Sequence, residues 1–329
     1  MRKAISKILV TGGAGFIGSA FVRLVSRGGN KVAVLDKLCY AADLKRLQEV
    51  KGKFKFFKAD ICDKFALDKI ISSQRPEIVV HFAAETHVDR SIIDADCFID
   101  TNVKGTQVLL ESCRKHKIKK FIHISTDEVY GEIKQGKFFE NSPLYPNSPY
   151  SASKAAADLI IRSYIRTYNF PAIIIRPCNN YGPWQYPEKF IARSILRILK
   201  DKKIAIYAKG ENVREWLHVD DCAQGILKVV HKGKIGQIYN LGSGQAKKNI
   251  DVAKLILKQM NKDEGMFEFV KDRPGHDFRY RLDSKKIFAD TGWKARFDFK
   301  EGLRKYIGWC YTHRLWILGK AGEVERLYR

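Results

Sequence analysis

A glycine-rich run near the start of the chain, Gly12-Gly-Ala-Gly-Phe-Ile-Gly18, lies between an apolar, β-branched segment and a segment with helical periodicity. Glycines at these positions let the backbone turn tightly and approach a pyrophosphate, which then lies at the positive end of the helix. On its own the run could also be an ordinary tight turn. A second apolar segment, Lys31–Asp36, ends in a carboxylate 18 residues after Gly18, where such folds hold an adenosine ribose. We therefore predict a dinucleotide-binding unit.

The charge of Asp36 repels a 2′-phosphate, so the chain favours NAD over NADP, although Lys37 beside it weakens that preference.

Strand and helix patterns alternate as far as residue 177, which predicts a doubly wound parallel sheet of the α/β Rossmann type. Strands are expected at residues 7–11, 31–36, 54–58, 78–82, 172–176 and in the first half of 121–131, with helices at about 16–27, 94–115 and 151–168. The alternation then breaks. Later helices are expected at about 188–200, 219–232, 251–261 and 300–313, with strands at 204–207 and at 237–241, where the chain rejoins the sheet.

We therefore predict two interwoven domains. Residues 1–177, with about 214–242, form an NAD-binding Rossmann domain. Residues 178–213 and 243–329 form a smaller C-terminal domain that binds the substrate.

The segment Phe121-Ile-His-Ile-Ser-Thr-Asp-Glu-Val-Tyr-Gly131 begins as a buried strand and ends in polar residues. Open α/β sheets bind ligands outside the carboxyl ends of their strands. Thr126, Asp127 and Glu128 are therefore candidate catalytic residues. In extended backbone the two carboxylates would point opposite ways. The alternative is that Asp127 caps the next helix and Glu128 is a solvated charge.

Tyr150 and Lys154 are one turn apart on a predicted helix, so they share a face. A lysine beneath a tyrosine hydroxyl lowers the pKa of the phenol, which can then act as a base near neutral pH. Tyr130 and Lys134 have the same spacing, but Gly131 between them indicates a loop. We therefore favour Tyr150 and Lys154.

The chain carries 60 Lys and Arg against 36 Asp and Glu, a net charge of +24. Such a charge suits nucleic acid, an anionic surface or an anionic small substrate. The basic residues are spread along the whole chain, so we expect a solvated basic surface and no nucleic-acid partner.

Seven cysteines without a Cys-x-x-Cys pair indicate a reducing, cytoplasmic location, with no disulfide framework and no metal site. Lys7 and the glycines interrupt the apolar start before it reaches the length of a signal peptide. No segment is long enough to span a membrane, so we expect no membrane association.

Together these motifs resemble the nucleotide-sugar 4,6-dehydratases of the extended short-chain dehydrogenase/reductase family, typified by dTDP-glucose 4,6-dehydratase. The resemblance covers nearly the whole chain. It rests on residues 11–18, Asp36-Lys-Leu, Asp60-Ile-Cys-Asp63, Ala83-Ala-Glu-Thr-His-Val-Asp-Arg-Ser91, residues 125–131, Tyr150 to Lys154, Asn179-Asn-Tyr-Gly-Pro183, Pro187-Glu-Lys189, Arg214-Glu-Trp-Leu217 and Arg273-Pro-Gly-His-Asp277. The Asp127–Glu128 pair and residues 179–183 best separate this group from related epimerases, decarboxylases and GDP-mannose dehydratases, which usually differ at one or both.

The resemblance implies that Tyr150, with Lys154 and Thr126, deprotonates the hydroxyl on carbon 4 of a nucleotide-activated glucose while NAD accepts the hydride. Glu128 would then remove the proton on carbon 5, and Asp127 would protonate the departing hydroxyl on carbon 6. The hydride returns to carbon 6, which gives a 4-keto-6-deoxy sugar. Such an elimination needs one protonated and one ionised carboxyl group.

The resemblance also implies the binding residues. The expected cofactor-binding residues are Gly12, Gly15, Phe16, Ile17, Gly18, Asp36, Lys37, Leu38, Tyr40, Asp60, Ile61, Phe82, Ala83, Ala84, Thr101, Ser125, Tyr150, Lys154 and Asn179. The expected substrate-binding residues are Thr86, Thr126, Asp127, Glu128, Asn180, Lys189, Phe190, Ile206, Tyr207, Arg214, Asn249, Arg273, His276 and Tyr280. The cations among them suit a pyrophosphate. Cys39 replaces the usual threonine of relatives beside the cofactor adenosine. Relatives are commonly homodimers through helices that correspond to residues 94–115 and 150–168.

Two other functions stay open from the sequence. One is a nucleotide-hexuronate decarboxylase or nucleotide-sugar 4-epimerase of the same family, which would not need Asp127 as an acid. The other is a non-catalytic, NAD-binding regulator that grips RNA or DNA, whose affinity would fall steeply with salt. The sequence does not distinguish dTDP from UDP as the nucleotide.

Overall fold

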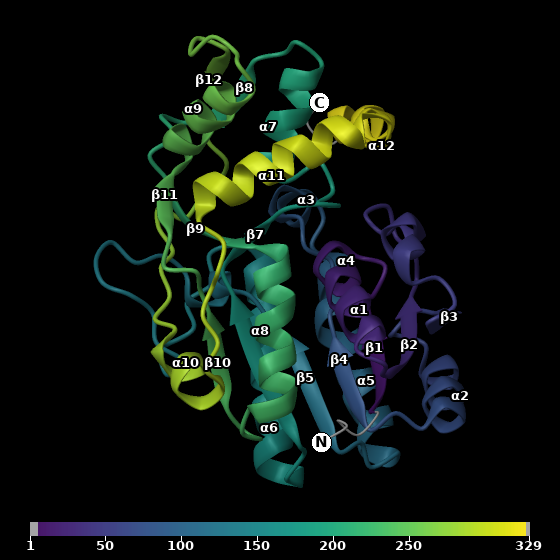
Figure 1. Cartoon of the computed structure of the whole chain (residues 1–329). Helices are drawn as coiled ribbons and strands as arrows, with labels where there is room; N and C mark the ends of the chain where they lie inside the picture. Colours follow the sequence, from purple (N-terminus) through teal and green to yellow (C-terminus); the bar gives the residue numbers. More distant parts are fainter. Residues whose placement is uncertain (1–5, 327–329) are drawn as a thin grey trace.

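The predicted parallel sheet forms the centre of the larger lobe (Figure 1). The computed structural model describes residues 6–326. Seven parallel strands lie in the order β10-β6-β5-β4-β1-β2-β3. They are β1 (Lys7–Thr11), β2 (Lys31–Asp36), β3 (Phe54–Lys58), β4 (Ile78–His81), β5 (Lys120–Ile124), β6 (Ala172–Pro177) and β10 (Ile238–Leu241). The doubly wound α/β class is confirmed, and the chain rejoins the sheet at β10 as predicted.

Helices cover both faces of this sheet because alternate side chains of each strand point to opposite faces. In β1, Ile8 and Val10 pack with α1 (Phe16–Arg27) and α8 (Val219–Lys232), whereas Leu9 packs on the other face. That other face is covered by α2 (Lys64–Gln74), α5 (Thr106–Lys115) and α6 (Pro149–Tyr168). Two apolar cores thus enclose the sheet.

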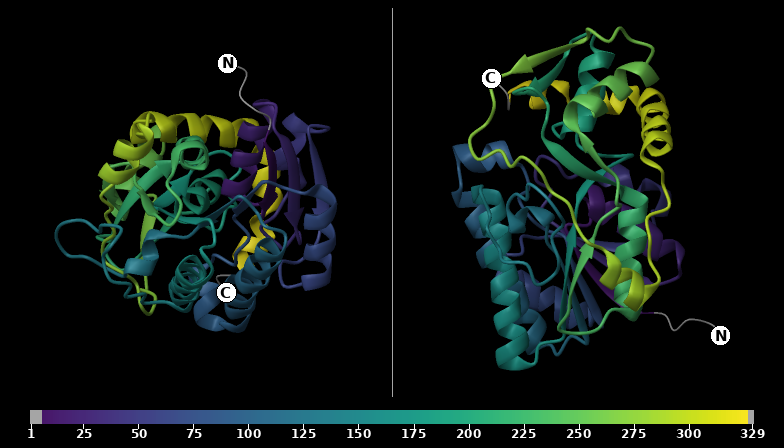
Figure 2. Two further views of the ribbon diagram at one scale, coloured as in Figure 1. Left: turned by 90° about the horizontal axis from the view of Figure 1, so that it is seen from below. Right: turned by 90° about the vertical axis from the view of Figure 1, so that its left-hand side faces the viewer.

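A smaller lobe with its own apolar core lies beyond the carboxyl ends of the strands (Figures 1 and 2). Its helices are α7 (Phe190–Leu199), α9 (Asn249–Gln259), α11 (Phe299–Thr312), α12 (Arg314–Gly319) and α13 (Ala321–Arg326). Its strands are β7 (Asn179–Tyr181), β8 (Ile204–Tyr207), β9 (Val213–His218), β11 (Ala246–Lys248) and β12 (Phe267–Val270), which form the sheets β11-β9-β7 and β12-β8. This lobe therefore covers the edge where a doubly wound sheet binds its ligands.

The helix predicted at about residues 94–115 is interrupted. Residues Asp96–Phe98 form α4, Ile99–Gly105 form a π-helical segment (η2), and α5 follows. Within η2 the Asn102 amide donates to the Glu85 carbonyl and the Ser153 hydroxyl, and its side-chain oxygen accepts from the Glu85 amide. Long-range bonds of this kind hold a widened turn that periodicity does not reveal.

We expected an extended backbone at Asp127 and Glu128. The backbone there instead forms the first turn of a 3-10 helix, η3 (Asp127–Tyr130). Thr126 caps this turn, because its hydroxyl accepts from the Glu128 amide at 3.3 Å. The alternative in which Asp127 is the cap is therefore wrong.

The helix expected at about residues 300–313 is present as α11, and two helices that were not expected, α12 and α13, follow it. The remaining elements are η1 (Leu44–Val50), α3 (Val88–Ile93) and α10 (Lys285–Thr291). Trp316 of α12 packs edge-on against Trp184, with ring centroids 5.2 Å apart. Helix α12 thus packs against a residue far away in the sequence as well as against Trp309 of α11, whose ring centroid lies 5.8 Å from that of Trp316.

All seven cysteines are free thiols. None of the helices within residues 6–326 has the length and apolarity needed to cross a membrane. Over the same residues, no cluster of His, Cys, Asp and Glu side chains has the arrangement of a metal site.

Candidate active site

A cavity of about 390 Å³ runs between the two lobes at the carboxyl ends of the sheet strands. It is lined by the glycine-rich loop, by the ends of β2 to β6, and by α6, α7, β9 and the loop at residues 273–276. All the predicted site residues line it except Leu38, Tyr40, Asp127, Ile206 and Tyr280. Residues that lie up to more than 250 positions apart in the sequence, from Gly12 to His276, thus meet at one site.

The glycine-rich loop forms a close backbone contact at one end of the cavity. A Cβ atom on Gly18 would lie 2.2 Å from the Gly12 carbonyl oxygen, and one on Gly12, whose φ is +69°, would lie 2.5 Å from the Ala83 amide nitrogen. The first turn of α1 follows directly, so its free backbone N–H groups face the cavity. This shape and dipole suit the pyrophosphate of a dinucleotide.

Asp36 ends β2 beside this loop and is buried. Its carboxylate accepts from the Ala14 amide at 2.9 Å and from the Leu38 amide at 2.8 Å, which fixes its direction. Burial raises the pKa of Asp36, and the two amides and the Arg46 charge oppose that rise. Each carboxylate oxygen can accept a further bond, as a ribose hydroxyl requires.

Several buried polar atoms around the cavity have no hydrogen-bond partner within residues 6–326. They include Ser125 Oγ, Asn179 Oδ1, Asn180 Oδ1, Asn249 Oδ1 and Arg273 Nε. An unsatisfied buried polar group costs about 1–3 kcal/mol. Their gathering around one cavity fits a large polar ligand such as a dinucleotide with a nucleotide sugar.

The two candidate carboxyl groups differ in their surroundings. Asp127 is fully buried behind the cavity wall, and its Oδ1 accepts from the Thr126 hydroxyl at 3.4 Å while its Oδ2 has no partner in the described chain. Burial, with the adjacent Glu128 carboxylate, raises the pKa of Asp127 well above its usual range. Burial also raises the pKa of Glu128, but the charges of Arg273, Lys189 and Arg214 oppose that rise. Asp127 therefore holds its proton more strongly.

Tyr150 and Lys154 both line the cavity, one turn apart on α6, whose N-terminus is fixed by a capping box at Ser148. The Lys154 ammonium donates to the Ile124 carbonyl at 2.8 Å and lies 3.4 Å from His123 Nε2. Burial lowers the pKa of Lys154 to about 8, against the opposing charge of Asp158.

The pKa of Tyr150 is raised by burial and by the Glu128 charge, with only the Thr126 hydroxyl opposing. We expected Lys154 to lower the pKa of the Tyr150 phenol toward neutral pH. In the described chain that pKa is raised instead, so this expectation is wrong. The charge that activates the phenol has to come from elsewhere.

The five predicted residues that do not line the cavity lie just behind it. Tyr40 donates to Glu188 Oε2 at 2.9 Å, and Leu38 has a left-handed backbone with φ +60°. Ile206 belongs to the core of the smaller lobe. The ring of Tyr280 lies under the Arg214 guanidinium, with 4.3 Å between the ring centroid and Arg214 Cζ.

A sequence profile described as GDP-mannose 4,6 dehydratase matches residues 9–306. The chain belongs to this dehydratase family. A dTDP-glucose 4,6-dehydratase of Streptomyces niveus is 44% identical to it over 318 residues, 94% of each chain. The solved structure of DesIV, a dTDP-glucose 4,6-dehydratase from Streptomyces venezuelae with NAD and TYD bound, superposes with a TM-score of 0.92 at 43% identity, covering 94% of this chain and 98% of that one.

A UDP-glucose 4-epimerase from Thermotoga maritima with UDP-glucose is also similar, with a TM-score of 0.88 at 30% identity over 93% of this chain and 99% of that one. Membership of the dehydratase family confirms the resemblance drawn from the motifs. It also confirms the expectation of an NAD-dependent enzyme of this class.

The dehydratase cavity also has lining residues that the motifs did not predict, among them His87, Asp89, Glu188, Arg193 and Arg197. Arg193 and Arg197 are four residues apart on α7 and so share a face, a signal that the sequence does contain. Asp89 lies inside the matched segment 83–91, but its partners come from the other lobe, which the sequence does not reveal.

Proposed function

We propose that this chain catalyses the NAD-dependent dehydration of dTDP-glucose to the 4-keto-6-deoxy sugar. The observation that carries the proposal is the pair of adjacent carboxyl groups, Asp127 and Glu128, at the exit of β5 and within electrostatic reach of Tyr150. An epimerase needs only a base near carbon 4, whereas loss of water across carbons 5 and 6 needs an acid and a base. The names of the relatives support the same reaction.

When bound, NAD supplies the hydride acceptor and a positively charged nicotinamide ring, which favours the phenolate form of a nearby tyrosine. The chain would hold it through the glycine-rich loop and α1 at the pyrophosphate and through Asp36 at the adenosine ribose. Ser125 and Asn179, whose side-chain oxygens have no partner in the described chain, are available to it further along the cavity.

In this proposal Tyr150 takes the proton from the hydroxyl on carbon 4. The Thr126 hydroxyl turns from Asp127 Oδ1, 3.4 Å away, to donate a hydrogen bond to the same substrate oxygen. Lys154 would hold a positive charge in the wall of the cofactor cavity, because its pKa of about 8 keeps it largely protonated at pH 7. The ketone formed at carbon 4 acidifies the proton on carbon 5.

Glu128 removes the proton on carbon 5, since it lines the cavity and three cations favour its ionised form. Asp127 delivers a proton to the departing hydroxyl on carbon 6, since burial and the neighbouring carboxylate keep it protonated. The hydride taken from carbon 4 would then return to carbon 6 and the proton held by Glu128 to carbon 5, which completes the 4-keto-6-deoxy sugar and leaves the cofactor as NAD. Two carboxyls with pKa values pushed apart are what such an acid–base pair requires.

The diphosphate and base would lie against Lys189, Arg214, Asn249, Arg273 and His276, which line the far end of the cavity. Arginine pairs with phosphate oxygens through two parallel hydrogen bonds, so these side chains suit a nucleoside diphosphate.

Three broader predictions accompany this function. The domain division at residues 177, 214 and 242 is retained as a proposal. A homodimer through the helices around residues 94–115 and α6 is supported by exposed apolar side chains there, Ile99, Leu159 and Tyr168. A cytoplasmic location is supported by the seven free thiols.

The test is to incubate the purified protein separately with dTDP-glucose and with UDP-glucose, without added reductant, and to identify the product by mass spectrometry and NMR. A 4-keto-6-deoxy sugar from dTDP-glucose is the expected product. A 4-epimer, with no loss of water, would establish the epimerase alternative instead. No product from either sugar would refute the proposal.

A further inference from the structure

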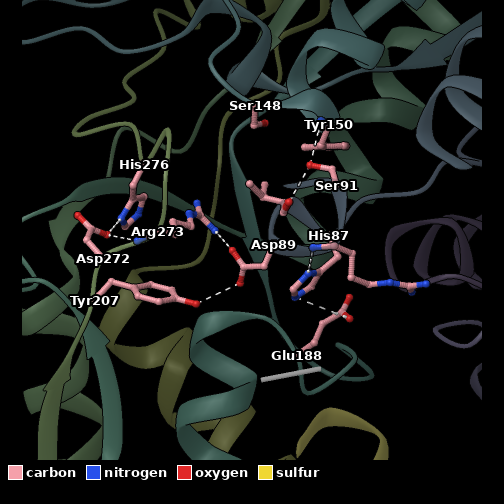
Figure 3. A network of polar contacts seen from close by, with 12 residues as sticks. His87, Asp89, Ser91, Ser148, Tyr150, Glu188, Tyr207, Asp272, Arg273 and His276 are labelled. Atoms are coloured by element: carbon pink, nitrogen blue, oxygen red, sulfur yellow. Dashed lines mark hydrogen bonds and ion pairs between the residues drawn. The ribbon is translucent and has the colours of Figure 1, made fainter. Parts of the chain in front are cut away.

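Asp89 is a carboxylate in the wall of a cavity that is also lined by several cations, among them Lys189, Arg214 and Arg273. It lies in the first turn of α3, and Figure 3 shows it between two side chains of the smaller lobe. Its Oδ1 accepts from Arg273 Nη1 at 3.1 Å, and its Oδ2 accepts from the Tyr207 hydroxyl at 3.1 Å. Both carboxylate oxygens are thus engaged by residues that we expect to face the substrate.

A negative charge at this place has an electrostatic cost for an enzyme that binds a diphosphate. Lys189, Arg193, Arg197 and Arg214 line the same region and attract phosphate, whereas Asp89 repels it. Its presence therefore needs a compensating role, and its two partners indicate which one.

The partners of Asp89 come from the other lobe. Asp89 follows β4 of the large sheet, whereas Tyr207 ends β8 and Arg273 lies in the loop after β12. The neighbouring residues make further contacts across the cavity. The Lys189 ammonium donates to the Thr86 carbonyl at 2.6 Å, and His87 Nε2 lies 3.9 Å from the Glu188 carboxylate. The segment 86–89 is thus the place where the larger lobe holds the substrate wall.

Helix α3, which contains Asp89, also reaches the catalytic helix, because the Tyr150 amide donates to the Ser91 hydroxyl at 3.1 Å (Figure 3). One short helix, α3, therefore connects the arginine of the substrate wall with the backbone of the catalytic tyrosine.

Arg273 has a second anion within reach. The charges of Arg273 and Glu128 act on each other across the cavity. Without Asp89, the guanidinium would be free to form an ion pair with Glu128, which would make that carboxylate a weaker base. With Asp89 in place, Nη1 of Arg273 is held by Asp89 Oδ1 at 3.1 Å, and the buried Nε of Arg273 has no partner in the described chain. A planar guanidinium anchored at one nitrogen presents its other donors in a fixed direction.

We propose that Asp89 is a positioning residue: it anchors Arg273 across the two lobes, so that the remaining guanidinium donors face the substrate diphosphate and stay away from Glu128. This inference rests on the proposed function, because it requires a nucleoside diphosphate in the cavity. Tyr207 shares the anchor by donating to the second carboxylate oxygen.

The test measures the affinity of NAD-loaded protein for dTDP alone, by calorimetry, so that binding is separated from catalysis. Asp89→Asn keeps the shape and removes the charge, and it should weaken dTDP binding by roughly tenfold, as loss of a charge-assisted hydrogen bond does. Asp89→Glu should recover part of the loss. Asp96→Asn, which removes a charge from an exposed side chain of the next helix, is the matched control and should bind dTDP like the wild type.

A double-mutant cycle separates positioning from a general structural role. In an Arg273→Met background, Asp89→Asn should have no further effect or should improve binding, because an unpaired Asp89 only repels the diphosphate. Additive losses would overturn the proposal, as would an unchanged dTDP affinity in Asp89→Asn. NAD content and thermal unfolding identify a variant that fails to fold. If Asp89→Asn fails to fold, Tyr207→Phe, which keeps the Asp89–Arg273 pair, should still show a smaller loss of dTDP affinity.

The outcome for Asp89 is distinguishable from that of the proposed function. A wild-type protein that binds dTDP but does not dehydrate dTDP-glucose would refute the function while the dTDP measurements still decide the role of Asp89.

Discussion

Replacing Asp127 by asparagine should separate the first chemical step from the second. Asparagine has the same shape and keeps an acceptor for the Thr126 hydroxyl, which lies 3.4 Å from Asp127 Oδ1. It has no proton to give to a leaving hydroxyl. The variant should therefore still oxidise carbon 4 and reduce its bound NAD, but it should stall before water is lost.

The size of the effect follows from the role of the group. A positioned general acid contributes about 10²- to 10⁴-fold to a rate, or about 3–5 kcal/mol of the barrier. The higher part of this range is expected here, because Asp127 is shielded from bulk solvent and water has little access to replace it. Turnover should fall by roughly that factor, whereas binding of dTDP should not change.

The same substitution has a predicted effect on stability. The ordinary pKa of an aspartate is 3.8, and burial raises that of Asp127 well above it. Below that ordinary value both the folded and the unfolded chain carry the proton. Above it the unfolded chain ionises first, so the wild type loses up to about 1.4 kcal/mol of stability per pH unit until the raised folded pKa is reached. An asparagine at this position does not ionise and carries no such penalty, so the variant should gain stability over the wild type as the pH rises above the ordinary aspartate pKa.

The assays are single-turnover absorbance of NADH on mixing with dTDP-glucose, product analysis by mass spectrometry, and thermal unfolding at a series of pH values. Asp96→Asn, at an exposed position, is the control for loss of one charge. Full turnover by Asp127→Asn would remove Asp127 from the acid role. Loss of NAD reduction would show that Asp127 acts in the first step, and a stability difference that does not vary with pH would refute the raised pKa.

Three further predictions concern the fold and the cofactor. Gly18→Ala should lose bound NAD, because its Cβ would lie 2.2 Å from a backbone oxygen. The control Gly308→Ala has open space around its Cβ and should change the free energy of unfolding by less than about 1 kcal/mol. Co-purified NAD and thermal unfolding measure both effects, and NAD retained by Gly18→Ala would contradict the role of Gly18 in the glycine-rich loop. Asp158→Asn should cost about 3–5 kcal/mol in denaturant unfolding, because it leaves the buried Arg176 without its carboxylate partner at 2.8 Å; a cost below about 1 kcal/mol would contradict this reasoning. Asp36→Asn should reduce the preference for NAD over NADP by roughly tenfold in coenzyme titrations, since one repelling charge is removed, and an unchanged ratio would show that Asp36 does not set it.

The sheet and the cofactor end of the cavity could be predicted from sequence because their causes are local. At Gly12 and Gly18 any side chain would clash with backbone, so the residue type itself reports the close approach. Strands β1 to β3 and helices α1 and α8 begin and end where the apolar periodicity does. Asp36 could be predicted because it is the last residue of strand β2, where such folds hold a ribose.

The chemistry of the candidate catalytic residues was only partly predictable. Tyr150 and Lys154 meet as expected because they lie one turn apart on one helix. Their pKa values depend on burial by distant elements. Burial raises the pKa of Tyr150, whereas we expected it to be lowered. The turn at Asp127 differs from the expected extended backbone for a local reason, because the Thr126 hydroxyl caps the turn and this cap competes with extended backbone.

The sequence by itself thus determined the parallel strands and the dinucleotide cradle, since the strand, glycine and helix patterns each depend on neighbours within about 20 residues. It offered Asp127 and Glu128 only as candidates, and their roles as acid and base came from the resemblance to the family. Only the tertiary structure decided which side chains form the substrate wall. Asp89 and Arg273 are 184 positions apart, and Ile206 and Tyr280 lie behind the wall rather than in it. Side-chain direction and long-range charge pairing arise when the two lobes pack together, and no local pattern in the sequence records that packing.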